Sequence, residues 1–206
     1  MYISDEDFKG QLTYLKGLFS LGGLSESGKS AAGLYFDSIG IKRMKIIQVE
    51  SDMMRERGIE FEDRPKEAEF QKLYSEDHEQ LFREFLYRLI AKMKQENVQY
   101  ASIESLYRAE LGAYLKRILA DRMINIYIDA PLELRAKRES IKQKDLNLSL
   151  AEMIARTKKK DQFKIEHGAL EVRDIADIIV NNGENIANLN QYLKIIDGIA
   201  KILKKD

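Results

Sequence analysis

The stretch Ser20–Phe36, SLGGLSESGKSAAGLYF, is the most informative part of the sequence. From Gly23 it follows the pattern G-x-x-x-x-G-K-S, in which a glycine-rich loop cradles phosphate groups. Such a loop binds phosphate when a strand leads into it and a helix N-terminus follows it. Leu18–Leu21 can form a short buried strand, and Ser30–Asp37 contains no helix breaker except Gly33, so the sequence supplies both elements.

This loop predicts a site for ATP and Mg2+. We expect Lys29 to reach the β- and γ-phosphates and the Ser30 hydroxyl to bind Mg2+. The residues expected to contact ATP here are Gly23, Leu24, Ser25, Glu26, Ser27, Gly28, Lys29, Ser30 and Ala31. Glu26 is unusual, because a carboxylate repels phosphate unless its side chain turns outward or meets an arginine. The alternative, a flexible connection that contains Gly-Lys-Ser by chance, does not account for the matching flanks.

Composition limits the kinds of protein that this chain can be. With 206 residues it is expected to form one domain, 1–206, with one good core. Lysine plus arginine equal aspartate plus glutamate, 34 against 34, so no overall field attracts nucleic acid or an anionic membrane. Cysteine is absent, which excludes disulfides, thiolate zinc sites and cysteine nucleophiles. No stretch approaches the length of a membrane span, and we expect a soluble, cytoplasmic protein with neither a nucleic-acid nor a membrane partner.

Short apolar runs alternate with longer helical patterns, which is typical of a parallel sheet covered by helices. The expected fold is therefore α/β, with three layers and five parallel strands. The predicted strands are Leu18–Leu21, Lys45–Val49, Gln99–Ile103, Ile124–Asp129 and Ala176–Asn181. A long helical stretch is predicted over 66–95 and a final amphipathic helix over 185–203. In such sheets the ligand binds outside the carboxyl ends of the strands, so the residues after each strand are candidates.

The segment after the second predicted strand, ESDMMRERG, places Asp52 and Arg55 one helical turn apart. One interpretation makes Asp52 a partner of metal-bound water or of an acceptor hydroxyl, and Arg55 a clamp for an anionic acceptor. The other makes Asp52 a cap at a solvated helix start. Spacing alone does not separate the two.

Two further segments follow strands. In IESLYRAE, Glu104 can orient metal-bound water or accept a proton, or it can form an ordinary helical pair with Arg108. In DAPLELRAKRE, Arg135 and Arg138 can close over the γ-phosphate. The lysines at 158–160 are expected to face solvent, because runs of like charge usually do.

These motifs in this order resemble P-loop nucleotide kinases of the adenylate kinase and dephospho-coenzyme A kinase type, most closely their uncharacterised kinase-like relatives. The resemblance covers nearly everything after Leu18 and rests on the P-loop, ESDMMRERG, IESLYRAE, IYIDAPLELRAKRE and ADIIVNNGE. It implies a helical acceptor-binding region over 53–95 and a lid over 136–160.

The resemblance also implies roles for single residues. Asp52 and Arg55 match the acceptor-site acid and the phosphate-binding arginine, and Arg108 is expected to join them. Glu104 stands where an aspartate usually ends the third strand, and Arg135 and Arg138 fall at the entrance to the lid. The turn expected to touch the adenine consists of Asn181, Asn182 and Gly183.

The sequence therefore predicts ATP- and Mg2+-dependent phosphoryl transfer to a small nucleotide or nucleotide-like acceptor, with Lys29, Asp52, Glu104 and Arg138 as the catalytic residues. A catalytically silent nucleotide-binding regulator is the alternative, because Glu104 replaces the usual aspartate and the lid lacks a regular arginine pattern. A guanine-nucleotide switch is a weaker alternative. It needs an Asn-Lys-x-Asp motif, and the chain has none.

Overall fold

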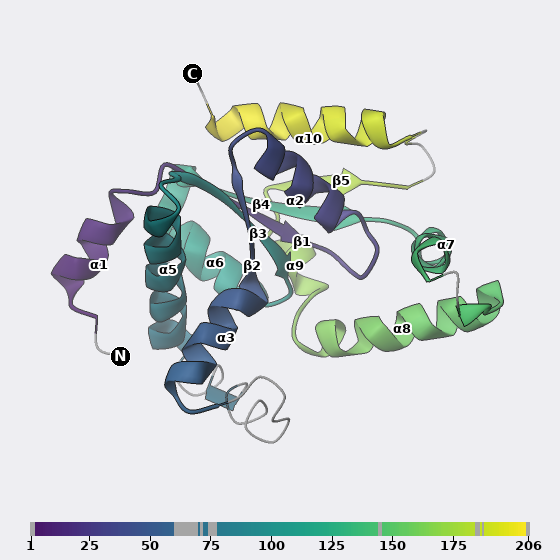
Figure 1. Ribbon diagram of the computed structural model, residues 1–206, viewed down its shortest axis with the longest axis horizontal. Coiled ribbons are helices and arrows are strands. Elements are labelled where there is room, and N and C mark those ends of the chain that lie inside the picture. Colours follow the sequence, from purple (N-terminus) through teal and green to yellow (C-terminus); the bar gives the residue numbers. More distant parts are fainter. Residues whose placement is uncertain are drawn as a thin grey trace.

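The computed structural model describes residues 3–59, 70, 72–73, 78–143, 146–183, 186 and 188–204. Its centre is one sheet of five parallel strands in the order β2-β3-β1-β4-β5, with helices on both faces (Figure 1). The strands are β1 (Gly17–Gly22), β2 (Lys42–Lys45), β3 (Tyr100–Leu106), β4 (Met123–Asp129) and β5 (Ile178–Asn181). The predicted three-layer fold with five parallel strands is confirmed.

The described helices connect and cover these strands. They are α1 (Asp5–Leu12), α2 (Lys29–Ser38), α3 (Ile46–Glu56), α5 (His78–Gln95), α6 (Ala109–Leu119), the 3-10 turn η1 (Ala120–Arg122), α7 (Leu132–Lys142), α8 (Leu150–Glu166), α9 (Glu171–Asp174) and α10 (Leu189–Leu203). The predicted long helix over 66–95 is observed as α5 in its C-terminal part, and residues 66–69, 71 and 74–77 lie outside the described residues. The final predicted helix is observed as α10, which begins a few residues later than expected.

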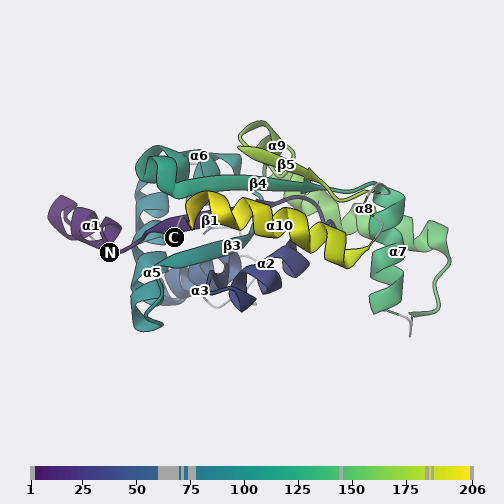
Figure 2. The same cartoon turned by 90° about the horizontal axis from the view of Figure 1, so that it is seen from above.

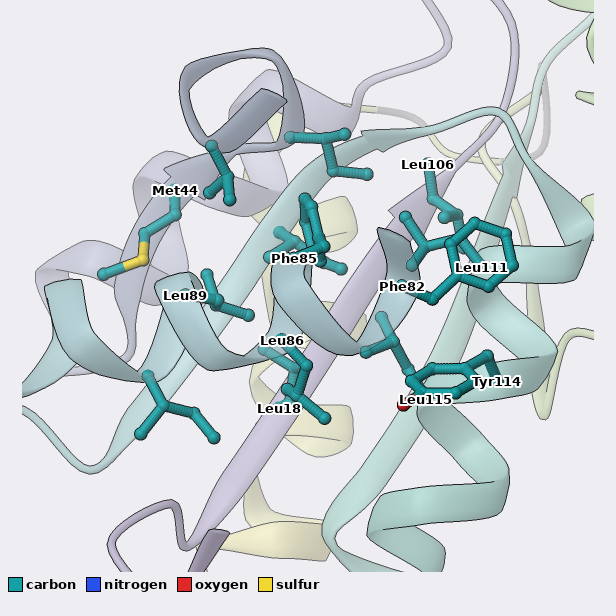
Figure 3. Close-up of a cluster of buried hydrophobic side chains, with 14 of the residues drawn as sticks. Leu18, Met44, Phe82, Phe85, Leu86, Leu89, Leu106, Leu111, Tyr114 and Leu115 are labelled. Atoms are coloured by element: carbon teal, nitrogen blue, oxygen red, sulfur yellow. The ribbon is translucent and has the colours of Figure 1, made fainter. Parts of the chain in front are cut away.

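Alternating side chains of the strands pack into two apolar layers. Leu18, Ile103 and Met123 face α3, α5 and α6, whereas Phe19 and Ile126 face α2 and α10. Figure 3 shows the first layer, where Phe85, Leu86 and Leu89 of α5 lie beside Leu18. Because successive strand residues point to opposite faces, the apolar runs of the inner strands supply both layers.

The second predicted strand is wrong in its position. The observed strand is Lys42–Lys45, and the segment predicted as strand, KIIQV, continues as the first turn of α3. Ile46, Val49 and Met53 are buried, a spacing that fits one face of a helix. The strand β2 lies at the sheet edge, and Met44 is its only buried residue. It therefore has no apolar run by which the sequence would indicate a strand. As a result, Asp52 lies in the second half of α3 and not at its start.

The carboxyl end of β3 carries a bulge. Leu21 of β1 pairs with Glu104 and Gly22 pairs with Leu106, so Ser105 is an extra residue on β3. Ser105 has a positive φ of 73°. Bulges of this kind change the direction in which neighbouring side chains point. Glu104 directly precedes the extra residue and lies within the strand, two residues before its end.

Helices α7 and α8 lie side by side beyond one end of the sheet, and α1 lies beyond the other (Figures 1 and 2). Helices α7 and α8 contain most of the predicted lid, 136–160, of which residues 144–145 lie outside the described part. None of the helices in the described ranges is long and apolar enough to cross a membrane.

Candidate nucleotide-binding site

The predicted phosphate loop connects β1 to α2 and has the backbone that its glycines allow. Gly23 and Gly28 have positive φ values of 124° and 118°, and Gly28 is the N-cap of α2. A Cβ atom on Gly23 would lie 2.3 Å from the carbonyl oxygen of Ile128, and one on Gly28 would lie 2.4 Å from Nδ2 of Asn182. Both positions therefore require glycine, for the φ angle and for the close approach of neighbouring groups. The N-terminus of α2 opens at the loop, where its N–H groups attract anions.

Lys29 lies at this N-terminus with its side chain folded back over the loop. Its Nζ donates hydrogen bonds to the carbonyl oxygens of Gly23, at 2.7 Å, and Leu24, at 2.5 Å. Burial, and after it the positive charge of Lys164, lower the pKa of Lys29 to about 7. An ammonium group in this position can exchange its carbonyl partners for the oxygens of an anion.

The hydroxyl of Ser30 and the carboxylate of Glu104 meet beside the loop. Ser30 donates a hydrogen bond to Oε1 of Glu104 at 2.5 Å, and Glu104 is buried. A hydroxyl and a carboxylate are oxygen ligands of the kind that Mg2+ prefers. No cluster of three His, Asp or Glu side chains occurs in the described part of the chain, so further ligands would come from water and nucleotide phosphates, as is usual for Mg2+. The two residues fit the expected ion.

Glu104 has a second partner that the sequence did not predict. Arg43 of β2 contacts Oε2 of Glu104 through Nε, at 2.7 Å, and through a terminal guanidinium nitrogen, at 2.5 Å. No local sequence pattern indicates that Arg43 is a site residue. It lies in a short polar edge strand, and its partner Glu104 lies on the neighbouring strand, β3.

The two arginines of α7 contact backbone carbonyl groups of the loop, and their predicted closure over a γ-phosphate stays a prediction. Arg135 donates to the carbonyl oxygens of Ala130 and Ser25, each at 3.0 Å. Arg138 donates to the carbonyl oxygens of Glu26, at 3.2 Å, and Asn182, at 3.0 Å. Burial lowers the pKa of Arg138 from its ordinary value, but guanidinium remains charged at neutral pH. Positive charge therefore surrounds the loop.

Helix α8 adds two residues that the sequence analysis missed. Asp161 accepts a hydrogen bond from the backbone N–H of Ser25 at 2.8 Å and pairs with Arg135 at 2.5 Å. Lys164 donates to the hydroxyl of Ser25 at 3.1 Å, and burial lowers its pKa. Met153, Thr157 and Asp161 are buried at a spacing of four, which is a helical face that the sequence could have indicated. The lysines at 158–160 are exposed as expected, and Lys160 pairs with Glu139.

The carboxylate of Glu26 pairs with Nζ of Lys142, at the end of α7, at 2.6 Å. The sequence left two solutions for this carboxylate, an outward rotamer or an arginine partner, and the structure shows a lysine partner instead. The side chain of Glu26 is 20% exposed, and Glu26 and Lys142 both line the cavity beside the loop. The negative charge near the loop is therefore neutralised locally.

A cavity of about 510 Å3 opens beside the loop. Its polar lining includes Lys29, Ser30, Arg138 and Asn182, and its apolar lining includes Ile141, Ile186 and Leu189. Nδ2 of Asn182 donates to the carbonyl oxygen of Ser27 at 2.7 Å, so the predicted turn 181–183 contacts the loop. The phenol of Tyr192, also in the lining, donates to the carbonyl oxygen of Gly28 at 3.0 Å. The lining therefore combines apolar side chains with several cations and the carboxylate of Glu26, a mixture typical of ligand pockets.

Asp52 and Arg55 lie in a different place. Asp52 accepts hydrogen bonds from Arg55, at 3.1 Å, and pairs with Lys92 of α5, at 2.5 Å. The side chain of Arg55 is 77% exposed. Both residues line a second cavity of about 490 Å3, between β2, α3 and α5, and no loop residue is among those that line it. Arg43 also lines this second cavity, so the guanidinium that holds Glu104 lies at its wall.

Arg108 lies at the start of α6, next to Tyr107. Its guanidinium carbon is 5.2 Å from the centre of the Tyr107 ring. The phenol of Tyr107 donates to Glu50 of α3 at 3.2 Å, and its ring lies 6.0 Å from that of Phe163 of α8. Burial raises the pKa of Tyr107, so the phenol stays protonated. The segment after β3 therefore joins α3 to α8 near the site.

Comparisons with known proteins concern the backbone. No protein-family model and no curated protein matches the chain. An uncharacterised protein from Eubacterium ventriosum is similar in structure, with 13% identity, a TM-score of 0.54 and coverage of 92% of this chain and 99% of that one. Shikimate kinase from Bacteroides thetaiotaomicron is 11% identical with a TM-score of 0.49, covering 91% and 98%. A gluconokinase from Sinorhizobium meliloti is 13% identical with a TM-score of 0.45, covering 92% and 96%. At these identities the likeness concerns the fold alone.

Proposed function

We propose that this protein transfers the γ-phosphoryl group of ATP to a small acceptor, a nucleotide or a nucleotide-like molecule. The observation that carries the proposal is the meeting of Ser30 and Glu104 beside Lys29, at the N-terminus of a helix. It brings a hydroxyl, a carboxylate and an ammonium group, the parts that phosphoryl transfer needs, to one point at the carboxyl ends of β1 and β3.

Each residue has a part in this proposal. The loop N–H groups and Lys29 bind the phosphates, and Arg135 and Arg138 add charge from the lid side. Ser30 and Glu104 would hold Mg2+, which neutralises the phosphate charge when it is bound. The turn 181–183 and the apolar wall of the first cavity receive the nucleoside. Catalysis then consists mainly of positioning and charge stabilisation.

The test begins with ATP. We expect Mg2+-ATP to raise the melting temperature of the wild-type protein, because a ligand that binds only the folded state stabilises it by about 2.7 kcal/mol at a hundredfold excess over Kd. Lys29→Ala should lose this stabilisation and the turnover while its melting temperature without ligand changes little, since Lys29 bonds only to loop atoms. Normal ATP turnover by a folded Lys29→Ala protein would contradict the proposal.

The acceptor has two proposed places. One is the second cavity with Asp52 and Arg55, and the other is the segment after β3 with Arg108. After acceptors have been screened by thermal shift, Arg55→Ala and Arg108→Ala should be compared by steady-state kinetics. The variant at the true acceptor site should lose roughly 10- to 150-fold in kcat/KM, as expected for one charge-assisted hydrogen bond of about 1.5–3 kcal/mol, with ATP affinity unchanged. The other variant should stay within about twofold.

A nucleotide-binding regulator without catalysis is the second candidate. It is favoured by the position of Asp52, which is engaged by Arg55 and Lys92 away from the phosphate loop. A regulator would bind Mg2+-ATP as tightly as the kinase does. It would show no acceptor-dependent turnover, so the acceptor screen separates the two.

A further inference from the structure

Arg43 reaches the candidate metal site from the edge of the sheet. Both nitrogens that contact Glu104 hold the same oxygen, Oε2, while the other oxygen, Oε1, accepts the hydrogen bond of Ser30. The two oxygens of the carboxylate thus have different partners, the guanidinium group for Oε2 and the serine hydroxyl for Oε1. The side chain of Glu104 is 6% exposed and that of Arg43 is 22% exposed, so water competes little for either.

Helix α2 provides the room for this contact. A Cβ atom on Gly33 would lie 3.0 Å from Nε of Arg43 and 3.2 Å from its Cδ, so the arginine side chain runs directly over this glycine. Ser30 and Gly33 are three residues apart and lie on the same face of the helix. One helix face therefore presents the hydroxyl to Oε1 and leaves the gap through which Arg43 reaches Oε2.

Two explanations of the pair make different predictions. If Arg43 only neutralises a buried carboxylate, any cation at this position would serve, because the requirement is charge. If it fixes the orientation of the carboxylate, the requirement is a planar group with two donors, which lysine does not have. The contact of two nitrogens with one oxygen favours orientation, since it determines which oxygen faces Ser30.

We infer that Arg43 is a positioning residue for the phosphoryl transfer proposed above, on which this inference rests. It keeps Oε1 of Glu104 directed at Ser30, where Mg2+ and its water would be held. Groups that orient the ligands of a metal site typically contribute 10- to 100-fold to metal affinity or activity.

The experiment compares Arg43→Lys with wild type and uses Arg117→Lys as the matched control. Arg117 lies in α6, pairs with Glu79 at the surface and lines neither cavity. Calorimetry with a non-hydrolysable ATP analogue, with and without Mg2+, measures the gain in affinity that the metal gives. We expect Arg43→Lys to reduce this gain by about 10- to 100-fold with Mg2+-free binding unchanged, and to lower kcat by a similar factor. Arg117→Lys should match wild type in all three.

A second variant, Gly33→Ala, tests orientation with both charges kept. Its methyl group would displace Arg43 by a few tenths of an ångström, so it should reduce the Mg2+-dependent gain in the same direction as Arg43→Lys but by less. An Arg43→Lys protein with wild-type Mg2+ dependence and kcat would overturn the inference and leave the proposed function intact. A wild-type protein whose nucleotide affinity does not respond to Mg2+ would instead overturn the proposed function, and the role of Arg43 with it.

Discussion

Lys29 has a pKa of about 7, so the proposed nucleotide binding would be coupled to proton uptake. Burial and Lys164 lower the pKa to about 7, while Glu104 and Asp161 raise it and Arg135 lowers it. Phosphate anions favour the ammonium form, so the pKa in the complex is higher than in the free protein. Above pH 7 the free lysine is mostly neutral, so binding takes up a proton, and affinity should fall as pH rises from 7 toward the pKa of the complex.

The proton can be counted by calorimetry at pH 8, in two buffers with different ionisation enthalpies. We expect the uptake to approach one proton for each ATP analogue bound. Lys29→Arg is the control, because an arginine is protonated in both states and its residual binding should take up none. Equal binding enthalpies in the two buffers for the wild-type protein would mean that Lys29 is already charged in the free protein.

At the scale of the element, α2 depends on the glycine that begins it. Gly28 combines a positive φ with a close contact to Asn182, so Gly28→Ala should lower the free energy of unfolding by about 1–3 kcal/mol, as expected for a side chain forced into this conformation. Gly198→Ala in α10 is the matched control. No atom lies within 4 Å of its added Cβ, and this change at an exposed position inside α10 should raise the free energy of unfolding by about 1 kcal/mol. Urea unfolding measures both, and a stabilised Gly28→Ala protein would contradict the strained cap.

The position of β2 was predicted wrongly because the segment after it is more apolar than the strand itself. The runs at Leu18 and Ile124 belong to inner strands that are covered on both faces, and their apolar residues are continuous. KIIQV is equally apolar but buries one helical face, and short runs of this kind fit a strand and a helix equally well. The true strand, Lys42–Lys45, is polar because it lies at the edge. Periodicity therefore located the three inner strands and the outer strand β5, and it misplaced the outer strand β2.

The site was predictable where its residues are neighbours in sequence. The loop from Gly23 to Ser30 follows from a local motif, and Glu104 followed from its place at a strand end. The contact between Ser25 and Asp161 joins residues 136 positions apart, and that between Arg43 and Glu104 crosses 61 positions. Such pairs are created by the arrangement of α8 and β2 around the loop, and nothing in the sequence next to either residue encodes the partner.

At the scale of the whole molecule, the two cavities lie in different places, one beside the loop and the other beside β2, α3 and α5. The first cavity is lined by three parts of the chain that are far apart in sequence. They are the loop at 26–31, the end of α7 at 138–142, and a C-terminal part with residues 182, 186 and 188–192. The second is lined by β2, α3 and α5. A ligand in the first cavity contacts all three of its segments, so it should suppress local opening in each of them together.

Hydrogen exchange with a non-hydrolysable ATP analogue and Mg2+ tests this division. At a hundredfold excess over Kd, amides in the three segments whose exchange requires opening of the cavity should exchange about 100-fold more slowly, as a stabilisation of about 2.7 kcal/mol implies. Residues 46–55 of α3 serve as the internal reference and should exchange at an unchanged rate. Protection of the loop alone would mean that the base does not lie between α7 and α10. Protection centred on 42–55 would place the nucleotide in the second cavity, and the first would then have to receive the acceptor.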